Sequence, residues 1–308
     1  MTLRRSQVPT DPSAANGVMS GTYTPRSCKP SDMGPGYRPL VGSVASMSDP
    51  VIFVLVLIAG FFTGMLSGVF GVGGAVISTP AILVLGATPL QAVGSTLPSI
   101  IPSSIAGTLR YTRDGLVRRR VVLVTGLAGA TAAAAGAIAS DRFPGRGHAQ
   151  MVMTAGLMAF TAYRTATGGR TPPTVDGDGE RQFNLRPIPL IAIGLVAGLL
   201  SGFLGVGGGI VMVPAFTAIV GLDLKEAIGT SLACVGLIAI PGTLTHHLLG
   251  NVNWFYAVPL MISAIPGARV GAHLAISTSD RMLRVVVASV LGTISIGYGI
   301  AEFVALFT

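Results

Sequence analysis

Charged residues are scarce in this chain of 308 residues: only 10% are Asp, Glu, Lys or Arg, while 50% are hydrophobic. A soluble domain carries about 25% charged residues, so this sequence could not cover a water-facing surface. Its two cysteines, Cys28 and Cys234, cannot form a disulfide framework. Its 42 glycines show no Gly-X-Y period, which excludes collagen. The apolar runs are continuous rather than alternating, which excludes a transmembrane β-barrel and predicts an all-α, multi-spanning membrane protein.

The basic residues are gathered in short polar segments between the apolar runs. Arg110–Arg120 alone contains five arginines and one aspartate. This pattern is typical of the positive-inside signal of membrane proteins, and no basic and aromatic array of the RNA-binding type accompanies it. We therefore expect the lipid bilayer as a partner, no nucleic acid, and a location in the cell (inner) membrane.

The chain contains an internal duplication. Residues 60–81 and 194–215 are identical at eleven of 22 aligned positions. After one inserted residue the match resumes, and Gly94-Ser95-Thr96 aligns with Gly229-Thr230-Ser231. Glycines, prolines and hydroxyls that stay in register indicate a repeat rather than chance. The sequence thus predicts a disordered tail (1–49), a first transmembrane repeat (50–166), a polar linker (167–186) and a second transmembrane repeat (187–308).

Each repeat is expected to contain four full spans and one short apolar stretch after a glycine-rich break. The stretches 75–86 and 210–220 are about twelve residues long, too short to cross a bilayer of ~30 Å. We therefore expect about eight transmembrane helices and two Gly-interrupted half-helices. This even count would leave both termini and Arg110–Arg120 in the cytoplasm and favours parallel repeats. The matching loop, 246–253, has no arginine, which keeps inverted repeats as the alternative.

The glycines suggest two different roles. Gly60, Gly64 and Gly68 share one helix face, which predicts close packing against another helix. The breaks after Phe70 and Leu204 interrupt the apolar runs at membrane depth, where irregular backbone must be buried in protein or line a wet cavity. The first amides of the following half-helix could hold an anion, although a kink that serves only packing is the alternative. The candidate anion-binding residues of the breaks are Gly71, Gly73, Gly74, Ala75, Gly205, Gly207, Gly208 and Gly209.

Polar side chains near the breaks are further candidates. Hydroxyl pairs stand in the next helix of both repeats, where they either bind the anion or bond back to helix carbonyls; they are Ser95, Thr96, Thr230 and Ser231. Ser67 and Ser201 could belong to the same lining. Arg269, inside an apolar segment, is either an additional countercharge or reaches out to the interface. His246 and His247 end a helix, and His246 aligns with Tyr111. They are expected to anchor that helix end at the interface, with proton coupling as the alternative.

The sequence lacks the residues that most enzymes and metal proteins need. His148 and His273 are isolated, so no metal-ligand spacing exists. Neither a Ser-His-Asp set nor a pair of intramembrane carboxylates is present, and no ATP-binding motif appears. We therefore expect no enzyme, no cofactor and no metal.

The twin glycine breaks, each followed by a proline (Pro80, Pro214) and a Gly-Thr-Ser-type triplet, resemble the TauE/SafE sulfite exporter family, also called the four-toluene-sulfonate uptake permease family. The resemblance covers about residues 51–306. It implies a duplicated membrane unit that transports sulfite, sulfonates or other organosulfur anions. By position, the family's motifs fall on Gly71–Pro80 and Gly205–Pro214, with Ala75 in place of the third glycine of the first motif.

Together these observations predict a secondary transporter, an exporter, of sulfite or another small sulfur-containing oxyanion. The anion would lie at the half-helix N-termini between the repeats, and alternating access would move it. The alternative is a non-transporting membrane scaffold or assembly subunit whose glycines serve helix packing. The coupling ion, the direction of transport and the oligomeric state, a homo-oligomer included, stay open at this stage.

Overall fold

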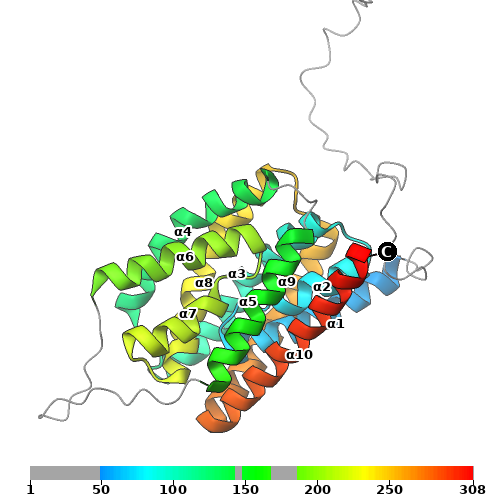
Figure 1. Cartoon of the computed structure of the whole chain (residues 1–308). Coiled ribbons are helices and arrows are strands. Elements are labelled where there is room, and N and C mark those ends of the chain that lie inside the picture. Colours follow the sequence, from blue (N-terminus) through cyan, green and yellow to red (C-terminus); the bar gives the residue numbers. More distant parts are fainter. Residues whose placement is uncertain (1–48, 143–147, 168–185, 308) are drawn as a thin grey trace, which may run out of the picture. The chain divides into compact units, whose positions relative to one another are not determined.

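The computed structural model describes residues 49–142, 148–167 and 186–307, so the predicted tail and most of the predicted linker lie outside the described residues. All the secondary structure within these ranges is helical (Figure 1), which confirms the predicted all-α class. The helices are α1 (Asp49–Phe70), α2 (Ala75–Val84), α3 (Pro89–Arg113), α4 (Arg119–Arg142), α5 (His148–Thr167), α6 (Pro187–Leu204), α7 (Gly209–Ala215), a π-helical turn (Phe216–Val220), α8 (Leu224–Leu248), α9 (Trp254–Ser277) and α10 (Asp280–Phe307).

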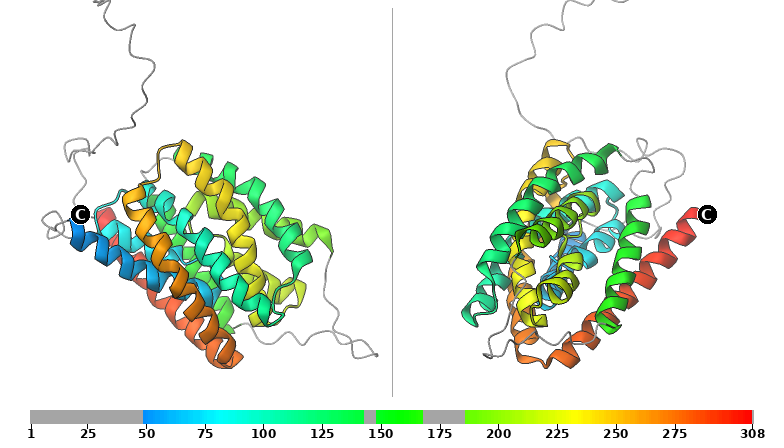
Figure 2. Two further views of the ribbon diagram at one scale, coloured as in Figure 1. Left: turned by 180° about the vertical axis from the view of Figure 1, so that it is seen from behind. Right: turned by 60° about the vertical axis from the view of Figure 1, so that its left-hand side comes forward.

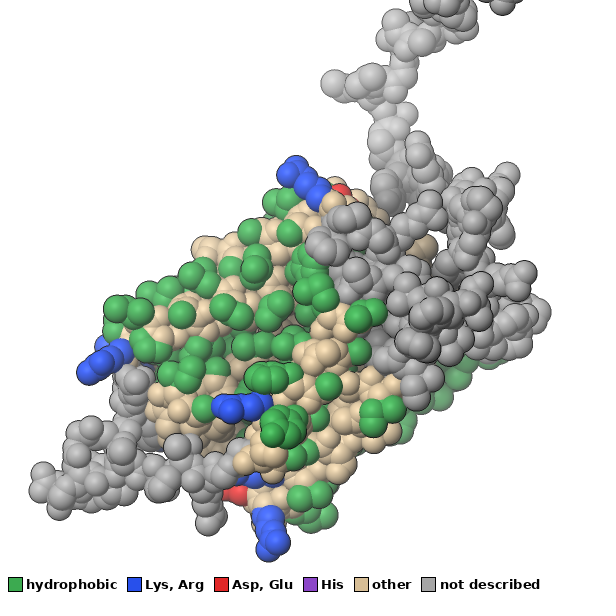
Figure 3. All heavy atoms as spheres, in the orientation of Figure 1, with side chains coloured by type: hydrophobic (Ala, Val, Ile, Leu, Met, Phe, Trp, Pro, Cys, Tyr) green, Lys and Arg blue, Asp and Glu red, His purple; other side chains and the backbone are tan. Residues whose placement is uncertain are grey.

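The outer surface of the bundle suits a bilayer. Among the described residues, five helices are long and apolar enough to cross a membrane: α1, α4, α6, α8 and α9. Large apolar side chains such as Ile188 and Leu248 are 79% and 77% exposed. Figure 3 shows one face on which hydrophobic side chains are widespread and charged ones few. Apolar residues exposed on this scale would be unfavourable in water and are favourable in lipid, so the chain is a multi-pass membrane protein.

The short helix α2 turns back along α1 instead of continuing across the bundle. Gly74, just before α2, lies against the carbonyl of Thr63 in the middle of α1. The far end of α2 packs with the beginning of α1, because Ile82 and Leu85 share a small apolar cluster with Val56. α1 and α2 therefore form a helical hairpin whose two ends lie at the same end of the bundle. α6 and α7 form the equivalent hairpin, with Gly208 against the carbonyl of Ala197.

The two halves of the chain are interlaced. α1 packs along α9, and its aligned counterpart α6 packs along α4; Figure 2 shows α1 and α9 side by side. A Cβ added to Gly64 would lie 2.7 Å from Cα of Ala264, and one added to Gly198 would lie 2.6 Å from Cα of Gly129. The predicted close packing of the glycine faces is therefore confirmed, and the partner helix comes from the other half of the chain.

The aligned helices α3 and α8 pack against each other in opposite directions. Leu97, early in α3, lies beside Gly242, late in α8, whereas Gly107, late in α3, lies beside Leu232, early in α8. A two-fold axis that relates these two helices must therefore be perpendicular to their length. This finding contradicts the parallel repeats that the arginine count favours. The physical reason is that each hairpin returns to the end of the bundle at which it starts, so the long helices that follow it, α3 and α8, start at opposite ends.

The loops collect at two ends of the bundle. At the basic end, the α3–α4 turn meets the beginning of α8, where Arg118 pairs with Glu226, and Lys225 donates to the Ile276 carbonyl at the end of α9. The Lys and Arg residues of these turns and of the start of α10 are Arg110, Arg113, Arg118, Arg119, Arg120, Lys225, Arg281 and Arg284.

The opposite end contains the start of α1, the end of α2 and the α8–α9 turn. There Tyr256 donates to the Leu85 carbonyl at 3.1 Å, and Asn251 donates to Asp141 at 3.2 Å. Since α3 leads from this end to the basic end, the expectation that the beginning of α1 shares a side with Arg110–Arg120 is wrong.

Candidate functional site

The two glycine breaks have nearly the same backbone. Three glycines in each adopt positive φ angles: 70°, 85° and 74° at Gly71, Gly73 and Gly74, and 70°, 85° and 68° at Gly205, Gly207 and Gly208. This left-handed region is open to glycine and costly for other residues. All six glycines are buried. The breaks are therefore fixed, matched turns inside the protein.

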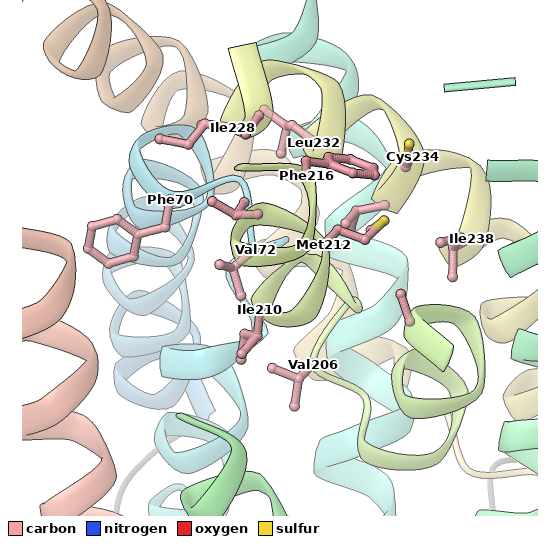
Figure 4. Packing of buried hydrophobic residues seen from close by; sticks show 14 of the residues in the cluster. Phe70, Val72, Val206, Ile210, Met212, Phe216, Ile228, Leu232, Cys234 and Ile238 are labelled. Atoms are coloured by element: carbon pink, nitrogen blue, oxygen red, sulfur yellow. The ribbon is translucent and has the colours of Figure 1, made fainter. Parts of the chain in front are cut away.

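The breaks meet each other at the middle of the bundle. A Cβ added to Gly73 would lie 3.5 Å from Cα of Gly207, and one added to Gly207 would lie 2.8 Å from the Val72 carbonyl oxygen. Both breaks also touch Ile100 and Val235, which lie halfway along α3 and α8. The apolar side chains around them, including those of Val72, Val206 and Ile210, form one cluster (Figure 4).

The backbone amides of the first break are available donors. Within the described residues, the N–H groups of Val72–Val76 have no hydrogen-bond acceptor; the first bonded amide of α2 is that of Ile77, to the Gly74 carbonyl at 3.2 Å. Such amides and the positive end of the helix dipole favour an anion. In the second break, the Gly209 amide already donates to the Gly207 carbonyl at 2.8 Å. Ala75 is fully buried.

Two of the four predicted hydroxyls donate a hydrogen bond to the glycine break of the other half of the chain. Ser231 donates to the Gly71 carbonyl at 2.9 Å, and its aligned counterpart Thr96 donates to the Gly205 carbonyl at 3.4 Å. Each also bonds back to a carbonyl of its own helix, Ile228 for Ser231 and Val93 for Thr96. These hydroxyls are thus brought to the breaks, where they bind the first glycine's carbonyl.

The other two hydroxyls accept bonds from the turns before the next helices. Ser95 accepts from the Asn253 amide at 2.8 Å, and Thr230 accepts from the Arg118 amide at 3.1 Å. They therefore connect the helix that carries them to the start of α9 or α4. A role of these hydroxyls in binding an anion stays a prediction.

Two ring side chains support the helices that lead into the breaks. Tyr111 donates to the Gly68 carbonyl at 2.8 Å, and His246, its aligned counterpart, bonds the Gly202 carbonyl through Nε2 at 2.9 Å. Both residues are fully buried, so His246 is not the interfacial anchor that the sequence suggested. The signal that could have found this role is their matched position in the two repeats.

Arg269 stands apart from the breaks. Its side chain is exposed on the outer face of α9, whereas neighbouring Ala268 is fully buried against Gly68. Its predicted role as an additional countercharge gains no support from this position. Within the described parts of the chain, no three His, Cys, Asp or Glu side chains come together as a metal ion would require.

Sequence reasoning missed Thr63. Its side chain lies against Gly74, at the beginning of α2, and its hydroxyl is buried without a hydrogen-bond partner among the described residues. The signal was present in the alignment of the repeats, because Ala197 occupies the equivalent position.

The chain matches the family model described as sulfite exporter TauE/SafE over residues 56–298. A probable membrane transporter protein of Bacillus subtilis, YunE, is 28% identical over 240 residues, which cover 72% of this chain and 88% of the relative. A probable membrane transporter protein of Xylella fastidiosa is 29% identical over 231 residues, covering 73% of this chain and 86% of the relative. No solved structure matches.

These matches cover both halves of the bundle and both glycine breaks. The family model accounts for well over half of the sequence, and both relatives are named as membrane transporters. This chain is therefore a membrane transporter that belongs to the sulfite exporter TauE/SafE family.

Proposed function

We propose that this transporter is a secondary carrier that exports sulfite or another small sulfur-containing oxyanion across the cell (inner) membrane. The observation that carries the proposal is the meeting of the two breaks halfway along α3 and α8, with unbonded amides at the start of α2. Amides that point from a helix start favour an oxyanion without any side-chain charge. The family description supports a sulfur oxyanion as the substrate.

In this proposal the anion lies between the two repeats. Backbone amides of Gly71–Ala75 and Gly205–Gly209 supply the donors, and the nearby hydroxyls of Ser95, Thr96, Thr230 and Ser231 complete or support the binding site. Alternating access would then arise from rocking of the interlaced halves around this point. The sequence contains no ATP-binding motif, so an ion gradient or the membrane potential would drive transport.

The membrane arrangement is part of the same proposal. All eight long helices lie in the bilayer, and each glycine-broken hairpin, α1–α2 and α6–α7, enters and leaves on one side. Three full crossings per repeat then give two repeats of opposite orientation, as the antiparallel packing of α3 and α8 supports. By the positive-inside rule the basic end faces the cytoplasm. The start of α1 and the end of α10 then face the other side, and not the cytoplasm as the sequence suggested.

Counterflow in proteoliposomes tests the proposed function. Vesicles that contain the purified protein and unlabelled sulfite should accumulate radiolabelled sulfite in a saturable manner. Thiosulfate, sulfate, taurine and a simple sulfonate, added as competitors, would rank the anions that the site accepts. Absence of exchange with every one of these anions, in protein that is folded and inserted, would contradict the proposal. That result would favour the scaffold alternative, in which the glycines serve only the helix packing seen between α1 and α9.

A further inference from the structure

The first hairpin carries buried hydroxyls that the second one mostly lacks. Each is at most 4% exposed, and its oxygen has no hydrogen-bond partner among the described residues; they are Thr63, Ser67, Ser78 and Thr79. The aligned residues of the second hairpin are Ala197, Ser201, Met212 and Val213. Only Ser201 retains a hydroxyl, which is also buried and unpartnered. The polar difference between the hairpins is therefore three hydroxyls.

Thr63 lies directly at the start of α2. Its Cγ2 atom is 2.8 Å from the position that a Cβ of Gly74 would take, and Gly74 is the residue before the first turn of α2. Ser67 follows Thr63 by four residues, so both side chains leave the same face of α1. The Thr63 side chain and the unbonded amides at the start of α2 thus lie close to each other.

Every group in this set can donate a hydrogen bond. Buried polar groups in proteins are normally bonded, and hydroxyls in helices commonly satisfy themselves on the carbonyl one turn back. The hydroxyls of Thr63 and Ser67 do neither in the described structure. A fully deprotonated sulfur oxyanion such as sulfite offers several acceptor oxygens and no donor, so it is the chemical complement of such a cluster.

The second break is less suited to bind an anion. α7 has only seven residues before the π-helical turn, and the amide of its first residue, Gly209, donates to the Gly207 carbonyl. Ala197 offers no hydroxyl where Thr63 offers one. Among the described residues, other amides of this break are nevertheless unbonded; they are those of Val206, Gly207, Gly208 and Ile210. The two hairpins therefore differ in their buried hydroxyls rather than in the presence of free amides.

We propose that the oxyanion binds to the first hairpin, through the amides at the start of α2 and the hydroxyls of Thr63 and Ser67. This narrows the two-break site proposed above to the first hairpin, because the second hairpin packs against it and has no hydroxyl at the position of Thr63. This inference rests on the proposed function and names the half of the protein that recognises the substrate. It also assigns Thr63 and Ser67 as residues that bind the anion.

The test compares two aligned serines. Proteoliposomes with the wild type, Ser67→Ala or Ser201→Ala are assayed for sulfite counterflow at increasing sulfite concentration. Loss of one hydrogen bond to a charged ligand should raise the half-saturating concentration about tenfold. We expect this rise for Ser67→Ala and a change below about twofold for Ser201→Ala. Thr63→Val should behave like Ser67→Ala, and Thr63→Ser should restore binding.

Thermal unfolding in detergent separates a ligand from a structural hydroxyl. Because the Thr63 hydroxyl has no hydrogen-bond partner among the described residues, Thr63→Val should leave the melting temperature unchanged or raise it, while weakening transport. Equal weakening by Ser67→Ala and Ser201→Ala would overturn the inference, as would unchanged half-saturation in Ser67→Ala and Thr63→Val. Wild-type protein that exchanges none of the tested anions would instead contradict the proposed function, and the inference with it.

Discussion

The two hairpins that meet inside the bundle have the same backbone and different side chains. Their aligned glycines agree in φ within a few degrees, and their entry helices pack on the other half through equivalent glycine faces. Yet the first carries Thr63 beside the start of its short helix, and the second carries Ala197 there. The difference teaches that packing of a duplicated unit requires both copies to keep one shape, whereas one binding site requires ligands from only one copy.

The two ends of the bundle differ in a similar way. Both α3 and α8 begin with a capping box, formed by Thr88 and Gln91 in one and by Asp223 and Glu226 in the other. Both residues of the α8 box are acidic, whereas both residues of the α3 box are uncharged, and Glu226 pairs with Arg118. The fold thus keeps the helix start in both repeats and confines the charged version to the basic end.

The side of the membrane on which each end of the bundle lies can be tested with reporters that are either active or inactive. If the basic end is cytoplasmic, the end of α10 faces the opposite side. Alkaline phosphatase fused after Thr308 should then be active, and a green fluorescent protein fused there should be dark. The same reporters inserted between Leu116 and Val117 should give the reverse result. Fluorescence at both positions would contradict the arrangement of the hairpins.

Bulky residues at the meeting point of the breaks should abolish transport. Gly73→Leu and Gly207→Leu force a side chain into a backbone with φ of 85°, within about 3 Å of Val235 Cγ1. We expect loss of sulfite counterflow with membrane insertion retained. Gly115→Leu is the matched control, since Gly115 has φ of 70° but open space around it. Normal sulfite counterflow by both Gly73→Leu and Gly207→Leu would show that the breaks play no part in transport.

Packing variants should affect the two halves equally. Valine at Gly64 or Gly198 would clash with the backbone of α9 or α4, and overpacking of this kind costs about 3 kcal/mol. Both variants should lower the melting temperature in detergent by similar amounts. Gly156→Val, where a side chain meets open space, is the control. A large fall in melting temperature in only one of the two variants would contradict the structural equivalence of the two hairpins.

The smallest expected effect concerns the hydroxyls that bind the breaks. Ser231→Ala removes a bond of 2.9 Å to the Gly71 carbonyl, and Thr96→Val removes one of 3.4 Å to the Gly205 carbonyl. A buried hydrogen bond contributes about 1 kcal/mol, so Ser231→Ala should lower thermal stability more than Thr96→Val. A larger loss of thermal stability in Thr96→Val than in Ser231→Ala would contradict the expectation that the shorter of the two hydrogen bonds contributes more.

The sequence allowed much of this fold to be predicted, because glycine spacing is a local signal. The all-helical class, the short helices after Gly74 and Gly208, and the close packing at Gly64 and Gly198 agree with the structure. The orientation of the repeats could not be predicted in the same way. α1 has 22 residues, enough to span a bilayer. Contacts in the folded chain, of Gly74 with Thr63 and of Ile82 and Leu85 with the cluster around Val56, reveal that the chain then turns back.

The candidate site was harder to predict, since it depends on contacts between halves. The glycines could be predicted because both repeats keep them, whereas Thr63 could not be selected in this way, because the other repeat has Ala197 at that position. The Ser231–Gly71 bond joins residues 160 positions apart, and no local pattern could have predicted it. Arg269 was proposed from its depth in an apolar segment, although its position on the outer face of α9 depends on how the helices pack.

Equilibrium binding of radiolabelled sulfite to the purified protein tests the central claim most directly. With ligands on the first hairpin only, the wild type should bind about one sulfite per chain, and thiosulfate should displace it. Thr63→Val should weaken this binding about tenfold, while Ser201→Ala should leave it unchanged. Two equivalent anions per chain, or binding that Ser201→Ala weakens as much as Thr63→Val does, would contradict the account.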